Sequence, residues 1–209
     1  MPNNLIKREE LTKIIVTAFE IEGSDGDINF ADINKNEWYY PFVKKAYNAG
    51  IVKGMSDETF GTSSYVTRQD IAVMLSRVLE KYGKNLEYTK DYTAFADENE
   101  ISAYALDGVK TLYKLGVISG YEDGTFRPDQ PITRAEAMTI INRMLGRGVS
   151  KGYVCKGAVR YTDNDPGSWY YFEVLEATND HEYRNARPFE QWIRATILRS
   201  YDMDKYERP

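Results

Sequence analysis

Three arginines recur at the first position of a predicted helix, at Arg8, Arg68 and Arg134. A cation at this position opposes the helix macrodipole, at a cost of about 0.3–1 kcal/mol, so its repetition needs a reason. The start of a helix also offers backbone N–H groups, and a guanidinium can bind a carboxylate or phosphate through two parallel hydrogen bonds. The three positions therefore predict anion sites. The alternative is that each arginine pairs with an acidic residue of its own or the next repeat.

A second set of candidates places an aspartate shortly before an aromatic residue. An aromatic ring offers a face for stacking against a sugar, and a carboxylate accepts hydrogen bonds from sugar hydroxyls. The alternative is that the aspartate caps a helix and the aromatic ring packs in the core. The pairs are Asp32 with Trp38, Asp97 with Tyr104, and Asp163 with Trp169.

The helices that must position these residues follow from the apolar pattern and its flanks. Apolar side chains starting at Ile71 recur at i, i+3, i+4, i+7 and i+8, which predicts an amphipathic helix. Thr67 and Thr133 stand at the N-cap, each with an acidic residue three positions later, whereas Lys7 weakens the cap of the first copy. Glycines suited to end the preceding helix stand at Gly50 and Gly116.

These elements belong to a repeat of about 65 residues. The motif FAD at residues 30–32 returns at residues 95–97, and Gly54 corresponds to Gly120. The two ends of the chain match opposite halves of this repeat. We therefore expect one domain, 1–209, with internal units 30–83 and 95–148, a third unit formed by the halves 5–20 and 161–187, and a closing segment 188–209.

A pair of helices cannot bury its apolar stripe alone, whereas three pairs around a pseudo-threefold axis can. The expected fold class is therefore mostly α, with three helix-loop-helix units in one domain. The N-terminal helix should pack beside residues 169–178, because each half-repeat lacks its partner. The closing segment is predicted to form a helix that begins near Pro188, the favoured first-turn residue.

These motifs resemble the S-layer homology domain, which usually occurs as a triplet. The family's TRAE motif stands at residues 133–136, with variants that begin at Thr67 and Lys7, and the resemblance covers residues 5–178. It implies a three-pronged helical spindle that binds a secondary cell-wall polymer, often with pyruvylated amino sugars, in grooves between neighbouring units. Such a module tethers a larger exported protein to the bacterial cell wall or S-layer.

The resemblance also implies the roles of the candidate residues. The motif arginine contacts the ketal carboxylate, while the aromatic residue, the aspartate and the loop glycine shape the groove. Tyr104 replaces a tryptophan, and the segment after Trp169 lacks the glycine-rich loop, so we expect fewer than three tight sites, the tightest using Arg68 or Arg134. The predicted ligand-binding residues are Arg8, Arg68, Arg134, Asp32, Asp97, Asp163, Trp38, Tyr104, Trp169, Gly54 and Gly120.

Composition excludes several other classes of protein. The net charge of −5 argues against nucleic-acid binding, and no apolar run approaches the roughly 18–20 residues of a membrane span. A single cysteine and a single histidine, Cys155 and His181, exclude an internal disulfide and a multi-histidine centre. The acidic runs 25–29 and 163–165 lack the full EF-hand spacing. We predict no cofactor and no metal site, and we expect His181 at the surface or at a helix cap.

Two alternatives remain beside a non-catalytic anchor. The first residues lack a signal peptide, and a chain that opens inside a repeat is expected to be part of a longer exported protein. A structural coat subunit would contact only sister S-layer proteins. A glycan-processing enzyme would use paired carboxylates, but three similar sites suit attachment better than one reaction centre.

Overall fold

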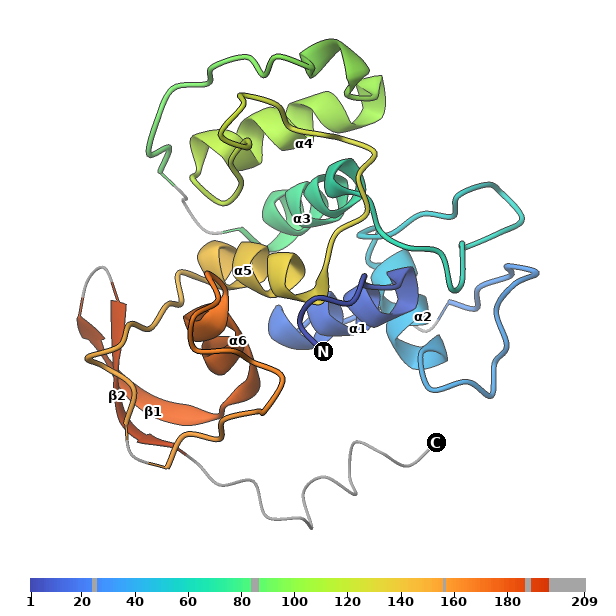
Figure 1. Ribbon diagram of the computed structural model, residues 1–209. Helices are drawn as coiled ribbons and strands as arrows, with labels where there is room; N and C mark the ends of the chain where they lie inside the picture. Colours follow the sequence, from blue (N-terminus) through green and yellow to red (C-terminus); the bar gives the residue numbers. More distant parts are fainter. Residues whose placement is uncertain (24–25, 84–86, 156, 187–188, 196–209) are drawn as a thin grey trace. The chain divides into compact units, whose positions relative to one another are not determined.

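The computed structural model describes residues 1–23, 26–83, 87–155, 157–186 and 189–195 (Figure 1). This part of the chain is rich in helix, as the sequence predicts, and none of its helices is long and apolar enough to cross a bilayer. The helices are α1 (Arg8–Ala18), α2 (Tyr40–Asn48), α3 (Arg68–Tyr82), α4 (Ala103–Lys114), α5 (Arg134–Leu145) and α6 (Tyr171–Thr178), with a 3-10 turn at Glu98–Glu100; the strands are β1 (His181–Ala186) and β2 (Phe189–Ala195).

The chain forms two compact units. The large unit comprises Leu5–Ile132, and the small unit comprises Met1–Asn4 together with the described residues from Thr133 onward. The predicted packing of the N-terminal helix beside residues 169–178 joins the two units and stays a prediction, as does the pseudo-threefold arrangement of the complete repeats.

Within each unit the helices pack in pairs. In the large unit α1 packs against α2 and α3 against α4, and in the small unit α5 packs against α6 (Figure 1). Each pair therefore joins the second helix of one repeat to the first helix of the next. The predicted apolar stripe is the contact face, since Ile71 and Leu75 of α3 and Leu11 and Ile15 of α1 are fully buried.

The helix starts and ends follow the predicted signals. The Thr67 side chain accepts a hydrogen bond from the Asp70 N–H at 3.2 Å, and Thr133 forms a reciprocal capping box with Glu136. At α1 half of this arrangement remains, because the Lys7 N–H donates to Glu10 at 3.0 Å while lysine has no side-chain acceptor. The glycines after α2 and α4, Gly50 and Gly116, adopt the positive φ values of +70° and +73° that suit a helix end.

The large unit contains a closed cycle of backbone hydrogen bonds. The Ile6 N–H donates to the Ile132 carbonyl at 3.1 Å, Ile132 to Val66 at 2.9 Å, and Val66 back to Ile6 at 3.1 Å. These residues occupy equivalent positions, each two residues before a motif arginine, and all three are buried. The segments that lead into α1, α3 and α5 therefore meet at one point.

The predicted closing helix is wrong where the structure describes it, because residues 189–195 form strand β2. They pair antiparallel with β1. Burial alternates along β2: Glu190 and Trp192 are buried, and Gln191 and Ile193 are exposed. This period of two suits a strand that lays one face on a core, and the Trp192 side chain fills that core. Pro188 and residues 196–209 lie outside the described residues.

Candidate ligand-binding pocket

A pocket of about 430 Å³ opens in the large unit between the start of α1, helix α3, the start of α4 and the loop at residues 53–55. Three predicted site residues, Arg8, Gly54 and Tyr104, line it although they come from three different copies of the repeat. They meet because helices pair across the repeat boundary. The full lining is Arg8, Lys53, Gly54, Met55, Asp70, Val73, Met74, Arg77 and Tyr104.

Arg8 is a buried and firmly held cation. The side chain is only 8% exposed, its Nη2 donates to the Lys53 carbonyl at 2.8 Å, and its guanidinium lies 5.1 Å from the centre of the Phe60 ring. Its buried Nε has no hydrogen-bond partner among the described residues. Burial lowers the pKa of the guanidinium, and attraction to Asp70 partly opposes this effect. A guanidinium that is held by a backbone carbonyl at the lining of a pocket is suited to bind an anion through its remaining donors.

Arg77 adds a second guanidinium to the same pocket. Its Nη1 donates to the Ile51 carbonyl at 3.2 Å, and burial lowers its pKa as well. With Lys53, the lining carries three cations against the single carboxylate of Asp70. The pocket is therefore electropositive, although the whole chain is acidic.

Tyr104 supplies an aromatic wall. Its hydroxyl donates to Asp70 Oδ1 at 3.1 Å, which fixes the ring, while 62% of the residue stays exposed. Burial of the hydroxyl and the nearby Asp70 carboxylate raise the pKa of Tyr104, so the ring stays neutral. A fixed, exposed ring beside two guanidinium groups can bind an apolar sugar face and an acidic substituent together.

The backbone N–H of each motif arginine already donates to a carbonyl, which narrows the anion sites expected at the helix starts. The Arg8 N–H donates to the Ser64 carbonyl at 2.9 Å, and the Arg68 N–H donates to the Gln130 carbonyl at 3.0 Å. In the small unit the Arg134 N–H donates to the Asn4 carbonyl at 2.8 Å. The chain segments that lead into the neighbouring helices occupy these donors. These arginines can therefore hold an anion through their side chains but not through their own backbone N–H groups.

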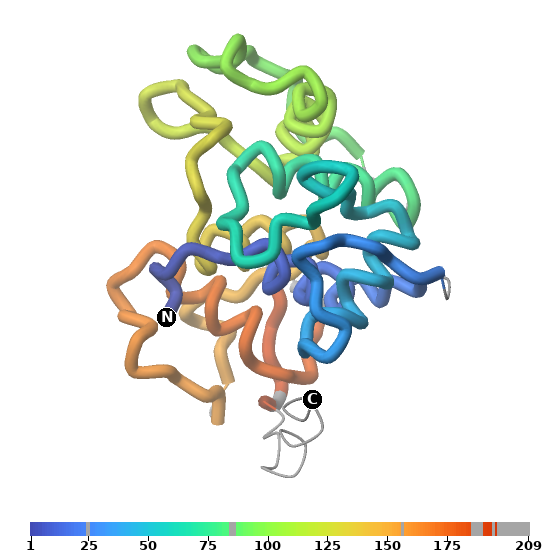
Figure 2. The backbone as a smooth tube through the Cα atoms, turned by 90° about the vertical axis from the view of Figure 1, so that its right-hand side faces the viewer, coloured from blue at the N-terminus to red at the C-terminus, as the bar shows by residue number. Residues whose placement is uncertain are grey.

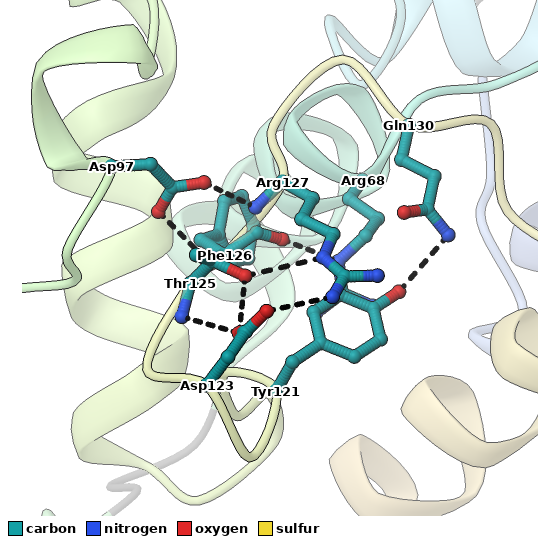
Figure 3. A network of polar contacts seen from close by, with 8 residues as sticks. All are labelled: Arg68, Asp97, Tyr121, Asp123, Thr125, Phe126, Arg127 and Gln130. Atoms are coloured by element: carbon teal, nitrogen blue, oxygen red, sulfur yellow. Dashed lines mark hydrogen bonds and ion pairs between the residues drawn. The ribbon is translucent and has the colours of Figure 1, made fainter.

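Arg68 holds a loop in place. Its Nε donates to the Phe126 carbonyl at 2.8 Å and its Nη2 to the Ser119 carbonyl at 3.0 Å. The guanidinium lies between the rings of Tyr121 and Phe126, 4.7 and 5.0 Å from their centres (Figure 3). Arg68 thus fastens the loop 119–126 to the start of α3, a structural role that the sequence did not indicate.

Two of the three predicted aspartates also fasten loops. Asp97 accepts hydrogen bonds from the backbone N–H groups of Phe126 and Arg127, both at 2.7 Å (Figure 3). In the preceding copy, Asp32 accepts three such bonds, all at 2.7 Å, from residues 60–62. Burial raises the pKa of Asp32, but these hydrogen bonds outweigh it and hold the pKa below its usual value. Neither aspartate caps a helix, and neither lines the pocket.

The candidates of the last copy lie in the small unit. Asp163 forms an ion pair with the Met1 ammonium at 2.7 Å, in the region where Figure 2 shows the N-terminus beside the orange segment. Arg134 is partly exposed, and Trp169 is 66% exposed with its ring edge-on to Tyr170. In the large unit Trp38 is also exposed, beside Lys13. Trp38 and Trp169 are therefore not core residues.

The two predicted loop glycines are required by close packing. An ideal Cβ at Gly54 would lie 2.1 Å from the Ser56 carbonyl oxygen, and one at Gly120 would lie 2.8 Å from the Phe95 ring. No larger residue fits without movement of the backbone or the ring. Gly54 lines the pocket, and because it has no side chain it leaves that part of the pocket open.

Arg77 is the main residue that the sequence analysis missed. A signal for it exists: Arg77 follows Asp70 by seven residues, which is two helical turns, so both lie on one face of α3. The same spacing separates Arg143 from Glu136 in the next copy. An arginine repeated on the face that begins at the capping acid could have been added to the candidates.

Comparison with known proteins identifies the family. Residues 29–72 and 94–138 match the S-layer homology domain, and the chain belongs to this family. The Cellulosome-anchoring protein of Acetivibrio thermocellus is 31% identical over 187 residues, which are 88% of this chain and 40% of that protein. The Surface-layer 125 kDa protein of Lysinibacillus sphaericus is 29% identical over 147 residues, 69% of this chain and 12% of that protein.

An enzyme is also among the relatives. The Endoglucanase of Bacillus sp. strain KSM-635 is 29% identical over 153 residues, 73% of this chain but only 16% of that protein. This chain spans less than half the length of each of these three relatives. The S-layer homology domain is a non-catalytic anchoring module, and these similarities indicate a secreted protein of the bacterial cell wall or S-layer.

Proposed function

We propose that this chain anchors a larger exported protein to the bacterial surface by binding an acidic secondary cell-wall polymer, with a pyruvylated amino sugar in the pocket around Arg8 and Arg77. The observation that carries the proposal is the meeting of the buried Arg8 guanidinium and the partly buried Arg77 guanidinium with the exposed ring of Tyr104. The carboxylate of a pyruvyl ketal would pair with the arginines, and the sugar ring would stack on Tyr104.

The arrangement of the repeats belongs to the same proposal. The hydrogen-bond cycle of Ile6, Val66 and Ile132 supports a pseudo-threefold spindle, because three equivalent segments meet there. Each complete groove would then combine residues of neighbouring repeats, as the pocket around Arg8 does within the large unit. Further grooves that use Arg68 or Arg134 stay a prediction, with Asp32, Asp97 and Asp163 as supports of the groove walls.

Co-sedimentation with purified cell-wall polymer tests the function. We expect the chain to sediment with polymer that carries pyruvyl groups and to stay in solution with polymer from which they have been removed. Equal binding to both preparations would contradict the assignment of the arginine pocket to a ketal carboxylate. Sedimentation of the chain without polymer would instead favour a coat subunit that binds its own copies, and release of sugar from the polymer would favour an enzyme.

Variants connect this result to the pocket. Replacing Arg8 by Ala should weaken polymer binding by about 10- to 100-fold, since a hydrogen bond to a charged group contributes about 1.5–3 kcal/mol. The matched control is Arg127→Ala, an exposed arginine of the same unit that lies outside the pocket lining and pairs with Asp123. The control should bind like the parent chain.

A further inference from the structure

The segment that departs from the repeat brings three metal-ligating side chains together in the small unit. Glu176 lies on α6, His181 begins β1, and Glu190 lies on β2. One donor atom from each lies within 4.8 Å of the others. Glu176 is 4% exposed and Glu190 is 5% exposed, so the cluster is buried. In Figure 1 the hairpin of β1 and β2 lies beside α6.

The histidine is oriented as a metal ligand would be. His181 Nδ1 lies 2.9 Å from the Asn179 carbonyl oxygen, which can only accept a hydrogen bond, so Nδ1 carries a proton. The other ring nitrogen, Nε2, points at the carboxylates, 3.2 Å from Glu190 Oε2 and 3.5 Å from Glu176 Oε1. A backbone carbonyl that fixes the distant nitrogen is the usual support of a metal-bound histidine. The ring also stacks on Trp192, 4.0 Å between centres.

Without a bound cation, the negative charges of the Glu176 and Glu190 carboxylates are only partly balanced. Glu176 Oε2 accepts a hydrogen bond from Trp192 Nε1 at 3.1 Å, but Glu176 Oε1 is buried and has no hydrogen-bond partner among the described residues. Two buried carboxylates carry two negative charges, and attraction to His181 and Arg147 offsets only part of that of Glu176. An unpaired charge in such a place is strongly unfavourable.

Comparison with the other repeats shows that Glu176 is unusual at its position. In α2 the residue equivalent to Glu176 is the exposed Lys45, and in α4 it is Thr111. A buried glutamate therefore stands in α6, the helix that the β1–β2 hairpin covers, where α2 has an exposed lysine. The same hairpin supplies His181 and Glu190. A site with a common ligand explains why the three side chains occur together.

We propose that Glu176, His181 and Glu190 bind one Zn²⁺ ion that fastens the hairpin to α6. Zinc binds imidazole nitrogen and carboxylate oxygen at about 2.0–2.2 Å, and a tetrahedral shell of that radius separates its donors by roughly 3.3–3.5 Å. The separations of 3.2 and 3.5 Å between His181 Nε2 and the two carboxylate oxygens are close to those of this shell. Water completes the fourth position. None of the three residues lines the pocket around Arg8.

The test uses the full chain after treatment with a chelator. Calorimetric titration with Zn²⁺ should give one saturable site per chain, and bound Zn²⁺ should raise the unfolding temperature. Glu176→Gln and Glu190→Gln should each weaken Zn²⁺ binding by about tenfold or more. The matched control is Glu182→Gln, an exposed glutamate of β1 next to His181, which should bind Zn²⁺ like the parent chain.

Spectroscopy on the unaltered chain keeps the proposal testable if a variant fails to fold. Co²⁺ in the site should give the intense visible absorption of a four-coordinate ion, and Zn²⁺ should abolish it by displacement. Absence of saturable Zn²⁺ binding to the unaltered chain would overturn the proposal. Equal Zn²⁺ affinity of the parent chain and both folded glutamate variants would overturn it as well, because the ion would then sit elsewhere.

Discussion

Replacing Asp97 by Asn tests whether this carboxylate holds the loop before α5 in place. The aspartate accepts two backbone hydrogen bonds at 2.7 Å, one on each oxygen, and it is 9% exposed. Asparagine keeps one acceptor oxygen but turns an NH₂ group toward the second backbone N–H. One hydrogen bond to a charged group is lost and one buried donor stays unsatisfied, so the free energy of unfolding should fall by about 2–3 kcal/mol.

Thermal unfolding followed by circular dichroism measures this loss. For a chain of this size, about 2–3 kcal/mol corresponds to a fall of about 4–12 °C in the unfolding midpoint. Glu122→Gln is the matched control in the same loop, because the Glu122 side chain is exposed at the surface. Its midpoint should stay close to that of the parent. An Asp97→Asn chain that unfolds at the parent temperature would refute the loop-holding role.

Three further predictions follow from the same contacts. The pKa of Asp32 is lowered in the folded chain, so its stabilising effect should be complete above the unfolded pKa of about 3.9 and vanish as the pH falls through the folded value. The difference in unfolding temperature between the parent chain and Asp32→Asn should therefore be largest at neutral pH and small at low pH. Gly54→Ala should lower stability by about 1–3 kcal/mol and weaken polymer binding, because its Cβ would overlap the Ser56 carbonyl, whereas Gly152→Ala meets nothing within 4 Å and should resemble the parent in denaturant titrations. Arg68→Ala should lose about 2–3 kcal/mol in the same titrations, since it frees two carbonyls; an unchanged midpoint would show that the loop does not depend on this arginine.

The sequence predicted the local structure well because the relevant forces act within a few residues. The start of α3 at Thr67, the start of α5 at Thr133 and the turns at Gly50 and Gly116 each depend on side chains or backbone angles at the position itself. The repeat then extends these signals from one copy to the next. For the same reason the apolar stripe of α3 predicted its buried face.

The sequence did not predict which residues meet across the fold. The helix-start N–H groups are occupied by backbone carbonyls from distant segments, such as Ser64 for Arg8, which no local pattern reveals. The residues of β2 are predicted to lie in a helix because Pro188 suits a first helical turn, whereas they pair with β1 and bury Glu190 and Trp192 on one face. A lone histidine beside acidic residues is expected at the surface or at a helix cap, yet the His181 side chain is only 7% exposed, between two carboxylates and Trp192.

The N-cap residue before each motif arginine favoured Arg68 and Arg134 over Arg8 as binding residues. Arg68 and Arg134 follow a capping threonine, so they were expected to form the tightest grooves. In the large unit, however, Arg68 lies between two rings and holds a loop, while Arg8, after the poorly capping Lys7, lines the pocket. What the side chain can bind depends on the burial of the guanidinium and on its neighbours, and not on the cap. The ranking of affinities stays a prediction.

Calorimetric titration with a short, homogeneous pyruvylated fragment of the cell-wall polymer tests the central claim most directly. The parent chain should bind the fragment at fewer than three sites, and Arg8→Ala and Arg77→Ala should each remove or weaken a site by about 10- to 100-fold while Arg127→Ala leaves it intact. Circular dichroism should show that all three variants are folded. Three equivalent sites in the parent chain would contradict the predicted inequality of the grooves. Unchanged binding in both folded pocket variants would contradict the assignment of the pocket around Arg8 and Arg77 to the glycan.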